Sequence, residues 1–220
     1  MTKVFVLSAN GGVGRYLVQQ LKAQNIDFTA GVRKEEQKAA LEAEGIHATL
    51  VDVETDNVEA LTSKFDGYDQ VVFSVGSGGH TGADKTIAVD LDGAVKAIYA
   101  SEAAKVDHFV MVSTWDSRRE AIEEGGNLQP YVIAKHYADD YLRRSSLKAT
   151  IVHPGILADE PGTGKIEIQS LFESPDDIHI PREDVASVLY EVLTQPEIHG
   201  KEFQIIGGNV EIHEAVASHK

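Results

Sequence analysis

A tyrosine and a lysine stand four residues apart in the segment Tyr131-Val132-Ile133-Ala134-Lys135. In a helix this spacing puts both side chains on one face. A phenol with an ordinary pKa of about 10 exchanges its proton poorly at neutral pH, and a neighbouring ammonium group favours the phenolate. The pair is therefore a candidate for proton transfer to and from a substrate. A tyrosine and a lysine on an ordinary helix are the alternative interpretation.

A second chemical feature is a glycine-rich segment near the N-terminus, Ser8-Ala9-Asn10-Gly11-Gly12-Val13-Gly14. Glycines let the backbone approach a phosphate closely, and the start of a helix offers free N–H groups and a partial positive charge. The segment follows the apolar run Val4–Leu7 and opens helix-forming sequence. This placement favours a phosphate-binding turn over a turn without a ligand.

The elements that would position these residues alternate along the chain. We expect strands at residues 4–7, 26–32, 46–53, 68–75, 108–113, 147–152 and 201–206. We expect helices at residues 13–24, 34–44, 55–64, 84–105, 129–144 and 182–194. Such alternation predicts an α/β fold with a doubly wound parallel sheet, a Rossmann fold, in a single domain over residues 1–220.

The least regular stretch is a small substrate-side excursion at about residues 155–181. Pro154-Gly155 and Pro161-Gly162-Thr163-Gly164 are turn signals that could act as hinges. Three apolar residues could line a small-substrate site, namely Leu157, Leu171 and Phe172. The excursion is predicted to form a mobile cover over the site, with a rigid surface excursion as the alternative.

The glycine-rich segment resembles the G-x-x-G-x-x-G turn of extended and atypical short-chain dehydrogenases/reductases. Gly11 and Gly14 match the second and third glycines, and Ser8 stands in place of the first. Tyr131 and Lys135, with Ser113 at the end of the expected strand 108–113, resemble the active-site residues of this family. The resemblance covers nearly the whole chain.

This resemblance implies a bound nicotinamide dinucleotide. Tyr131 would then protonate the oxygen of a carbonyl that receives a hydride, and Ser113 would hold that oxygen by a hydrogen bond. Lys135 would also reach the ribose hydroxyls. Asp90, in Val89-Asp90-Leu91-Asp92-Gly93, occupies the place where the family usually carries an active-site asparagine. A buried helix acid with a structural partner is the equal alternative for Asp90.

Further segments resemble cofactor contacts of the family. Asp52-Val53 resembles the adenine contact, with a loop-capping acid as the alternative, and His153-Pro154 lies where the family approaches the nicotinamide. The residues expected to bind cofactor are Ser8, Asn10, Gly11, Gly12, Val13, Gly14, Arg33, Lys34, Asp52, Val53, Val75, Gly76, Lys135, His153 and Pro154.

The end of the second expected strand predicts NADP(H), with NAD(H) less favoured. Folds that bind NAD usually place an acid there, whereas this sequence has Gly31-Val32-Arg33-Lys34. Arg33 could form paired hydrogen bonds to a 2′-phosphate. Because Glu35 and Glu36 follow, a solvated charge at the start of a helix is the alternative.

The composition of the chain limits the classes of partner that we expect it to bind. The net charge of −15 argues against nucleic-acid and membrane binding, because anionic surfaces repel the protein. The chain has no cysteine, which excludes disulfides, thiolate metal sites and cysteine nucleophiles, and its nine histidines show no metal-ligand spacing. We expect a cytoplasmic protein with a small-molecule substrate and no metal. The sequence favours no particular oligomeric state.

The function that these features favour is an NADPH-dependent oxidoreductase that reduces a small carbonyl or similar acceptor by hydride transfer. A non-catalytic NADP(H)-binding redox sensor and an NAD(P)-dependent epimerase/dehydratase are the alternatives. The intact Ser113, Tyr131 and Lys135 favour the enzyme, whereas the departures at Ser8 and Asp90 favour the sensor.

Overall fold

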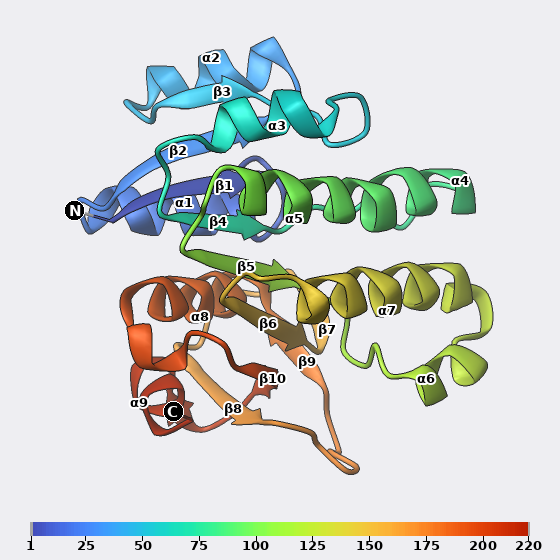
Figure 1. Ribbon diagram of the computed structural model, residues 1–220. Coiled ribbons are helices and arrows are strands. Elements are labelled where there is room, and N and C mark those ends of the chain that lie inside the picture. The colour runs from blue at the N-terminus through green and yellow to red at the C-terminus, as the bar shows by residue number, and fades with distance from the viewer. Residues whose placement is uncertain (1, 220) are drawn as a thin grey trace.

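The computed structural model describes residues 2–219, and a large sheet forms its centre (Figure 1). The strands of this sheet are β1 Lys3–Leu7, β2 Asp27–Val32, β3 Ala48–Leu50, β4 Gln70–Phe73, β5 His108–Val112, β6 Ala149–Pro154, β8 Lys165–Gln169, β10 Glu202–Gly207 and β11 Val210–Glu211. Two short strands, β7 Ile156–Ala158 and β9 His179–Pro181, pair with each other in a separate parallel ladder.

The order of strands across the sheet is β3-β2-β1-β4-β5-β6-β10-β8-β11. From β3 to β10 every neighbouring pair is parallel, and β8 then pairs antiparallel with β10 and with β11. The chain leaves β1 toward β2 and β3, and returns to the other side of β1 with β4. The carboxyl ends of β1 and β4 therefore flank a topological switch point, where such sheets bind ligands.

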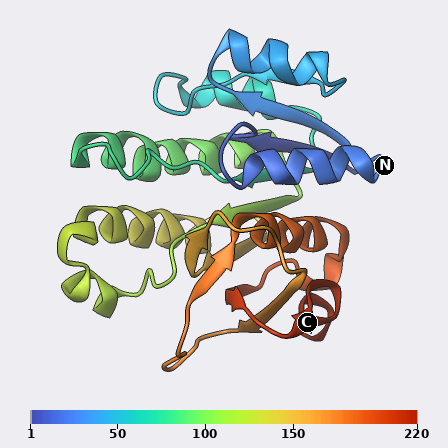
Figure 2. The ribbon, with the colours of Figure 1, turned by 180° about the vertical axis from the view of Figure 1, so that it is seen from behind.

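Helices cover both faces of the sheet. Their bounds are α1 Gly14–Ala23, α2 Glu35–Ala43, α3 Val58–Phe65, α4 Ala83–Lys85, α5 Ala94–Ala103, α6 Arg119–Glu124, α7 Gln129–Arg144, α8 Arg182–Thr194 and α9 Ile212–Ser218. Helices α3, α5 and α7 pack on one face, and α1, α2, α8 and α9 contribute to the core on the other. Figure 2 shows α1 and α8 side by side on that second face.

Burial on both faces explains why residues 4–7 of β1 are apolar. Val4 and Val6 of β1 belong to the core under α1 and α8, whereas Phe5 and Leu7 belong to the core under α3 and α5. Successive side chains of a strand point to opposite faces, so a strand covered on both faces needs apolar residues at every position. The strand that precedes the glycine-rich segment is therefore buried on both faces, as predicted for a strand inside a Rossmann fold.

The helix expected at residues 84–105 differs from the prediction. It consists of α4, a π-helical segment Thr86–Gly93 and α5. In the π-helical segment Gly93 lies against Val53, the last residue of the third expected strand, because a Cβ at Gly93 would come within 2.7 Å of Val53 Cγ2. π-helical turns are rare and occur often at functional sites, and this one carries Asp90.

The excursion at residues 155–181 is more regular than predicted. It contains β7, β8 and β9, and Ile166 of β8 is fully buried in the core. Its turn 161–164 is bound to the start of α8, since Asp184 accepts hydrogen bonds from the Thr163 and Gly164 backbone N–H groups, both at 2.9 Å. These contacts oppose hinge motion at that turn. The predicted mobile cover would therefore be formed by the segment between β8 and β9.

Within residues 2–219 no helix is long and apolar enough to cross a membrane.

Candidate functional site

The glycine-rich turn joins β1 to α1 and is tightly folded. Ser8 has φ of +63°, a left-handed conformation that glycine adopts most easily, which explains why the resembling family carries glycine there. The Ser8 carbonyl accepts a hydrogen bond from Gly11 N–H at 2.8 Å. A Cβ at Gly14 would lie 2.2 Å from the same carbonyl oxygen, so only glycine fits.

The start of α1 is open to a ligand. Its N-cap residue is Val13, and no side chain caps the helix. The first N–H groups of a helix have no partner within the helix and attract anions. Gly11 and Gly12 border the cleft in front of this helix end. The turn therefore fits the pyrophosphate of a dinucleotide.

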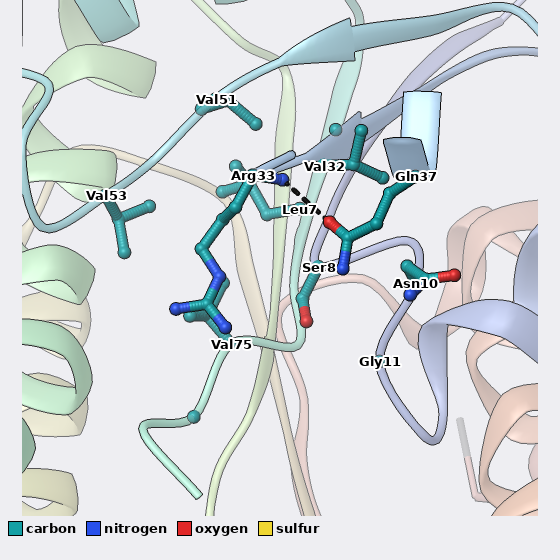
Figure 3. Close-up of a pocket in the computed structure, with 12 residues that line it drawn as sticks. Leu7, Ser8, Asn10, Gly11, Val32, Arg33, Gln37, Val51, Val53 and Val75 are labelled. Atoms are coloured by element: carbon teal, nitrogen blue, oxygen red, sulfur yellow. Dashed lines mark hydrogen bonds between the residues drawn. The ribbon is translucent and has the colours of Figure 1, made fainter. Parts of the chain in front are cut away.

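A pocket beside the turn holds the residues predicted to choose between cofactors (Figure 3). Its lining includes Arg33, Val53, Val75 and Asn10, together with Gln37, which sequence analysis missed. Gln37 Oε1 accepts hydrogen bonds from the backbone N–H groups of Arg33 and Lys34, both at 3.2 Å. Gln37 thereby fixes the backbone from which the Arg33 side chain extends over the pocket.

Four residues predicted to bind cofactor lie outside the lining of both clefts, namely Gly14, Lys34, Asp52 and His153. Lys34 is largely exposed and forms an ion pair with Glu36 at 3.5 Å. Asp52 caps its own loop, because its Oδ1 accepts a hydrogen bond from the Glu54 backbone N–H at 3.0 Å. This contact agrees with the alternative interpretation of Asp52 as a loop-capping acid.

The predicted active-site residues line a second cleft, which continues from the glycine-rich turn and has a volume of about 520 Å³. Ser113 follows β5, Tyr131 and Lys135 lie on α7, and Asp90 lies on the π-helical segment. The structure thus brings all four together from three separate elements. Gly76, Pro154 and Leu157 complete parts of the wall.

Lys135 and Asp90 form a buried ion pair. Lys135 Nζ lies 3.7 Å from Asp90 Oδ1, and their side chains are 3% and 0% exposed. The same ammonium group donates to the backbone carbonyls of Val75 and Val112, at 3.5 and 3.4 Å. It lies 5.7 Å from the centre of the Tyr131 ring. Asp90 therefore holds the lysine beside the tyrosine. It is a buried helix acid with a structural partner, as the alternative interpretation proposed, and it also lines the cleft.

Ser113 has a partner that sequence analysis missed. Its hydroxyl donates to Asp139 Oδ2 at 2.5 Å, and Asp139, one turn beyond Lys135 on α7, is fully buried. The second oxygen of Asp139 has no hydrogen-bond partner among the described residues. The spacing Tyr131-x₃-Lys135-x₃-Asp139 on one helix face was the available signal.

His153, predicted to bind cofactor, instead belongs to a network behind the cleft. Its Nδ1 lies 2.7 Å from the Thr114 carbonyl and its Nε2 lies 2.9 Å from Glu202 Oε1. Burial alone would lower the pKa of His153, but the hydrogen bond to Glu202 and the charge of Asp139 raise it. Both ring nitrogens face hydrogen-bond acceptors, an arrangement that stabilises the protonated ring, in which both nitrogens can donate.

The described residues contain no group of three or more His, Cys, Asp or Glu side chains that could hold a metal ion.

Comparison with known proteins identifies the family. The family described as NAD(P)H-binding matches residues 8–196, from the glycine-rich turn to the end of α8. The chain belongs to this NAD(P)H-binding family. The match confirms the predicted resemblance to atypical short-chain dehydrogenases/reductases and agrees with the fit of the turn to a dinucleotide.

Relatives of this NAD(P)H-binding protein carry two kinds of name. It is 43% identical over 217 residues to a Bacillus subtilis protein called uncharacterized sugar epimerase YhfK, with 97% and 98% of the two chains covered. A Bacillus halodurans structure, provisionally described as an NAD-dependent epimerase/dehydratase, is 40% identical with a TM-score of 0.91, covering 99% and 100% of the chains. The oxidoreductase ylbE from Lactococcus lactis is 31% identical with a TM-score of 0.83, covering 99% and 96%.

Proposed function

We propose that this protein is an NADP(H)-dependent oxidoreductase that interconverts a small carbonyl compound and its alcohol. The observation that carries the proposal is a single cleft lined by the glycine-rich turn and by Ser113, Tyr131 and Lys135. Its volume of about 520 Å³ lies within the range of roughly 300–1,000 Å³ that is common for ligand pockets. The nicotinamide group, when bound, supplies or accepts the hydride.

Tyr131 is the proton donor in this proposal. Its side chain lines the cleft, and the centre of its ring lies 5.7 Å from Lys135 Nζ. Asp90 and two backbone carbonyls keep Lys135 in place, so the ammonium position does not depend on the substrate. A proton lost by Tyr131 to the substrate oxygen is returned from solvent through the open cleft.

The hydrogen bond of Ser113 sets its role. A serine hydroxyl has one proton, and that of Ser113 is donated to Asp139. While that bond is made, Ser113 offers the cleft only an acceptor, so the substrate oxygen takes its hydrogen bond from Tyr131. This direction is the reverse of the donor role predicted from sequence for Ser113.

The preference for NADP(H) rests on Arg33. Its guanidinium group extends over the pocket beside the turn, where a 2′-phosphate would receive paired hydrogen bonds (Figure 3). We expect wild-type protein to bind NADPH at least about tenfold more tightly than NADH, since charge-assisted hydrogen bonds contribute roughly 1.5–3 kcal/mol. Fluorescence titration of both cofactors measures this preference.

The variant Arg33→Ala should lose the preference, whereas Lys34→Ala should retain it because Lys34 points to Glu36 outside the pocket. Equal affinities of the wild type for NADPH and NADH would refute the role of Arg33.

The enzyme itself is tested with a panel of small carbonyl substrates and NADPH consumption as the readout. On any substrate that turns over, Tyr131→Phe should abolish activity and leave NADPH affinity within about twofold, because only the hydroxyl is lost. Activity that survives in Tyr131→Phe contradicts the role of Tyr131. Tight NADPH binding without turnover on any substrate would instead favour the redox sensor.

An epimerase or dehydratase is the second candidate, and the names given to the two Bacillus relatives favour it. Such enzymes reduce and reoxidise their own cofactor within one cycle, so they retain it. Cofactor that remains bound through purification, with no net NADPH consumption on carbonyl substrates, would support this candidate over the oxidoreductase.

A further inference from the structure

Arg182, the first residue of α8, lies directly over the glycine-rich turn. A Cβ at Gly12 would come within 2.8 Å of Arg182 Cδ and 2.9 Å of Arg182 Nε, so the arginine side chain occupies the space that the missing side chain leaves. Packing of α8 against α1 brings it there, since Val185 and Leu189 share one core with Val13 and Leu17.

The charge of the cleft makes this arginine unusual. Within residues 2–219 the cleft of Ser113 and Tyr131 is lined by two cationic side chains, Lys135 and Arg182. Lys135 is buried and paired with Asp90, so its charge is already balanced. The protein as a whole carries −15 charges, and an anion bound here needs a local cation. Arg182 is the cation that the cleft offers.

The present partner of Arg182 holds it weakly. Its Nη1 donates to Asp159 Oδ1 at 2.5 Å, and the Asp159 side chain is 91% exposed while that of Arg182 is 28% exposed. Exposed ion pairs contribute little, because water screens them. Among the described residues no other acceptor bonds the Arg182 guanidinium, so further N–H donors are available beside Gly12.

We propose that Arg182 binds the pyrophosphate of the dinucleotide, and that Asp159 competes with the pyrophosphate for it. This inference rests on the proposed cofactor site and adds a residue and a regulatory contact to it. Asp159 directly follows β7 and Arg182 directly follows β9, the two paired strands that frame the excursion. Exchange of Asp159 for phosphate would therefore release the start of the excursion when cofactor binds.

Binding of three nucleotides distinguishes the proposed role of Arg182 from that of Arg33. NADP⁺ carries both a pyrophosphate and a 2′-phosphate, NAD⁺ carries only the pyrophosphate, and adenosine 2′-monophosphate carries only the 2′-phosphate. Arg182→Ala should weaken NADP⁺ and NAD⁺ binding equally, by about tenfold or more, and leave adenosine 2′-monophosphate unchanged. Arg33→Ala should weaken NADP⁺ and adenosine 2′-monophosphate and leave NAD⁺ unchanged. Calorimetric titration measures all three.

Two further variants complete the experiment. Asp159→Asn should strengthen NAD⁺ and NADP⁺ binding by about two- to fivefold, because it removes the competing charge. Arg182→Gln keeps much of the side-chain bulk and should lose affinity as Arg182→Ala does. Arg144→Ala is the matched control, since Arg144 pairs with Asp140 at the far end of α7 and should leave every affinity unchanged.

The outcomes are distinct. Unchanged NAD⁺ and NADP⁺ affinities in Arg182→Ala overturn the proposed contact between Arg182 and the pyrophosphate, while the proposed cofactor site stands. Equal weakening of all three nucleotides, with a lowered unfolding temperature, assigns Arg182 to folding and also overturns it. Failure of the wild type to bind either dinucleotide overturns the proposed function itself.

Discussion

Removal of the Lys135 charge tests whether the active-site lysine is held in place by Asp90. The two groups are buried and 3.7 Å apart. At an effective dielectric constant of about 20 their attraction is roughly 4–5 kcal/mol. Loss of one partner leaves the other charge buried and unpaired, which typically costs about 3–5 kcal/mol. We therefore expect Lys135→Met to lower the free energy of unfolding by about 3 kcal/mol.

Urea unfolding of wild type, Lys135→Met, Asp90→Asn and the double variant measures this coupling. The double variant removes both charges, so its loss of stability should be smaller than the sum of the single losses by about 1–3 kcal/mol. Lys38→Met is the control, because Lys38 forms an exposed pair with Glu42 at 3.9 Å and should cost less than about 1 kcal/mol. Additive single losses, within about 0.5 kcal/mol, would refute the buried pair as the source of the effect.

Three further predictions concern the turn and the opposite end of the sheet. Gly14→Ala should lower the free energy of unfolding by about 1–3 kcal/mol and weaken NADPH binding, since its Cβ would lie 2.2 Å from the Ser8 carbonyl; urea unfolding and fluorescence titration check this. Ser8→Gly should keep NADPH affinity and unfold at no lower urea concentration, because relief of the left-handed conformation, about 1–2 kcal/mol, offsets the greater flexibility of unfolded glycine; a clear loss of stability would contradict this. Burial, with the charges of His199 and Lys148, lowers the pKa of His108 to about 3, so its neutral ring stabilises the fold fully above pH 6.5 and less as the pH falls toward 3. Between pH 7 and 5 wild type should lose about 2 kcal/mol more than His108→Asn in urea unfolding, and equal losses would count against a neutral His108.

Elements with a strong local pattern could be predicted from the sequence. The expected helices at residues 129–144 and 182–194 coincide with α7 and α8, because apolar periodicity and proline placement mark both. The glycine-rich turn was predicted from its place between the first strand and the first helix, and the family resemblance implied that Ser113, Tyr131 and Lys135 meet in one site, as they do in the cleft. Local sequence carried this information.

Contacts between distant segments escaped prediction. Asp139 and Arg182 gain their contacts only when elements far apart in the sequence pack together. The contacts of Gln37 with the Arg33 and Lys34 backbone are local to the start of α2. The strand β8 lies in a stretch rich in turn signals, and its pairing with β10 supplies the stability that its own pattern does not indicate. The ring contacts of His153 were not predicted, because alternation along β6 turns its ring away from the cleft that Pro154 borders.

The two arginines place positive charge on both sides of the proposed cofactor site. Arg33 follows β2 on one side of the glycine-rich turn, and Arg182 begins α8 on the other, so both flank the carboxyl end of β1. A protein with 15 net negative charges repels anions, and local cations at the switch point offset this repulsion most for a ligand long enough to meet both. Because each arginine faces a different cleft, a ligand with a single phosphate gains one contact and a phosphorylated dinucleotide gains two. We therefore propose that this arrangement favours NADP(H) over shorter nucleotides as well as over NAD(H).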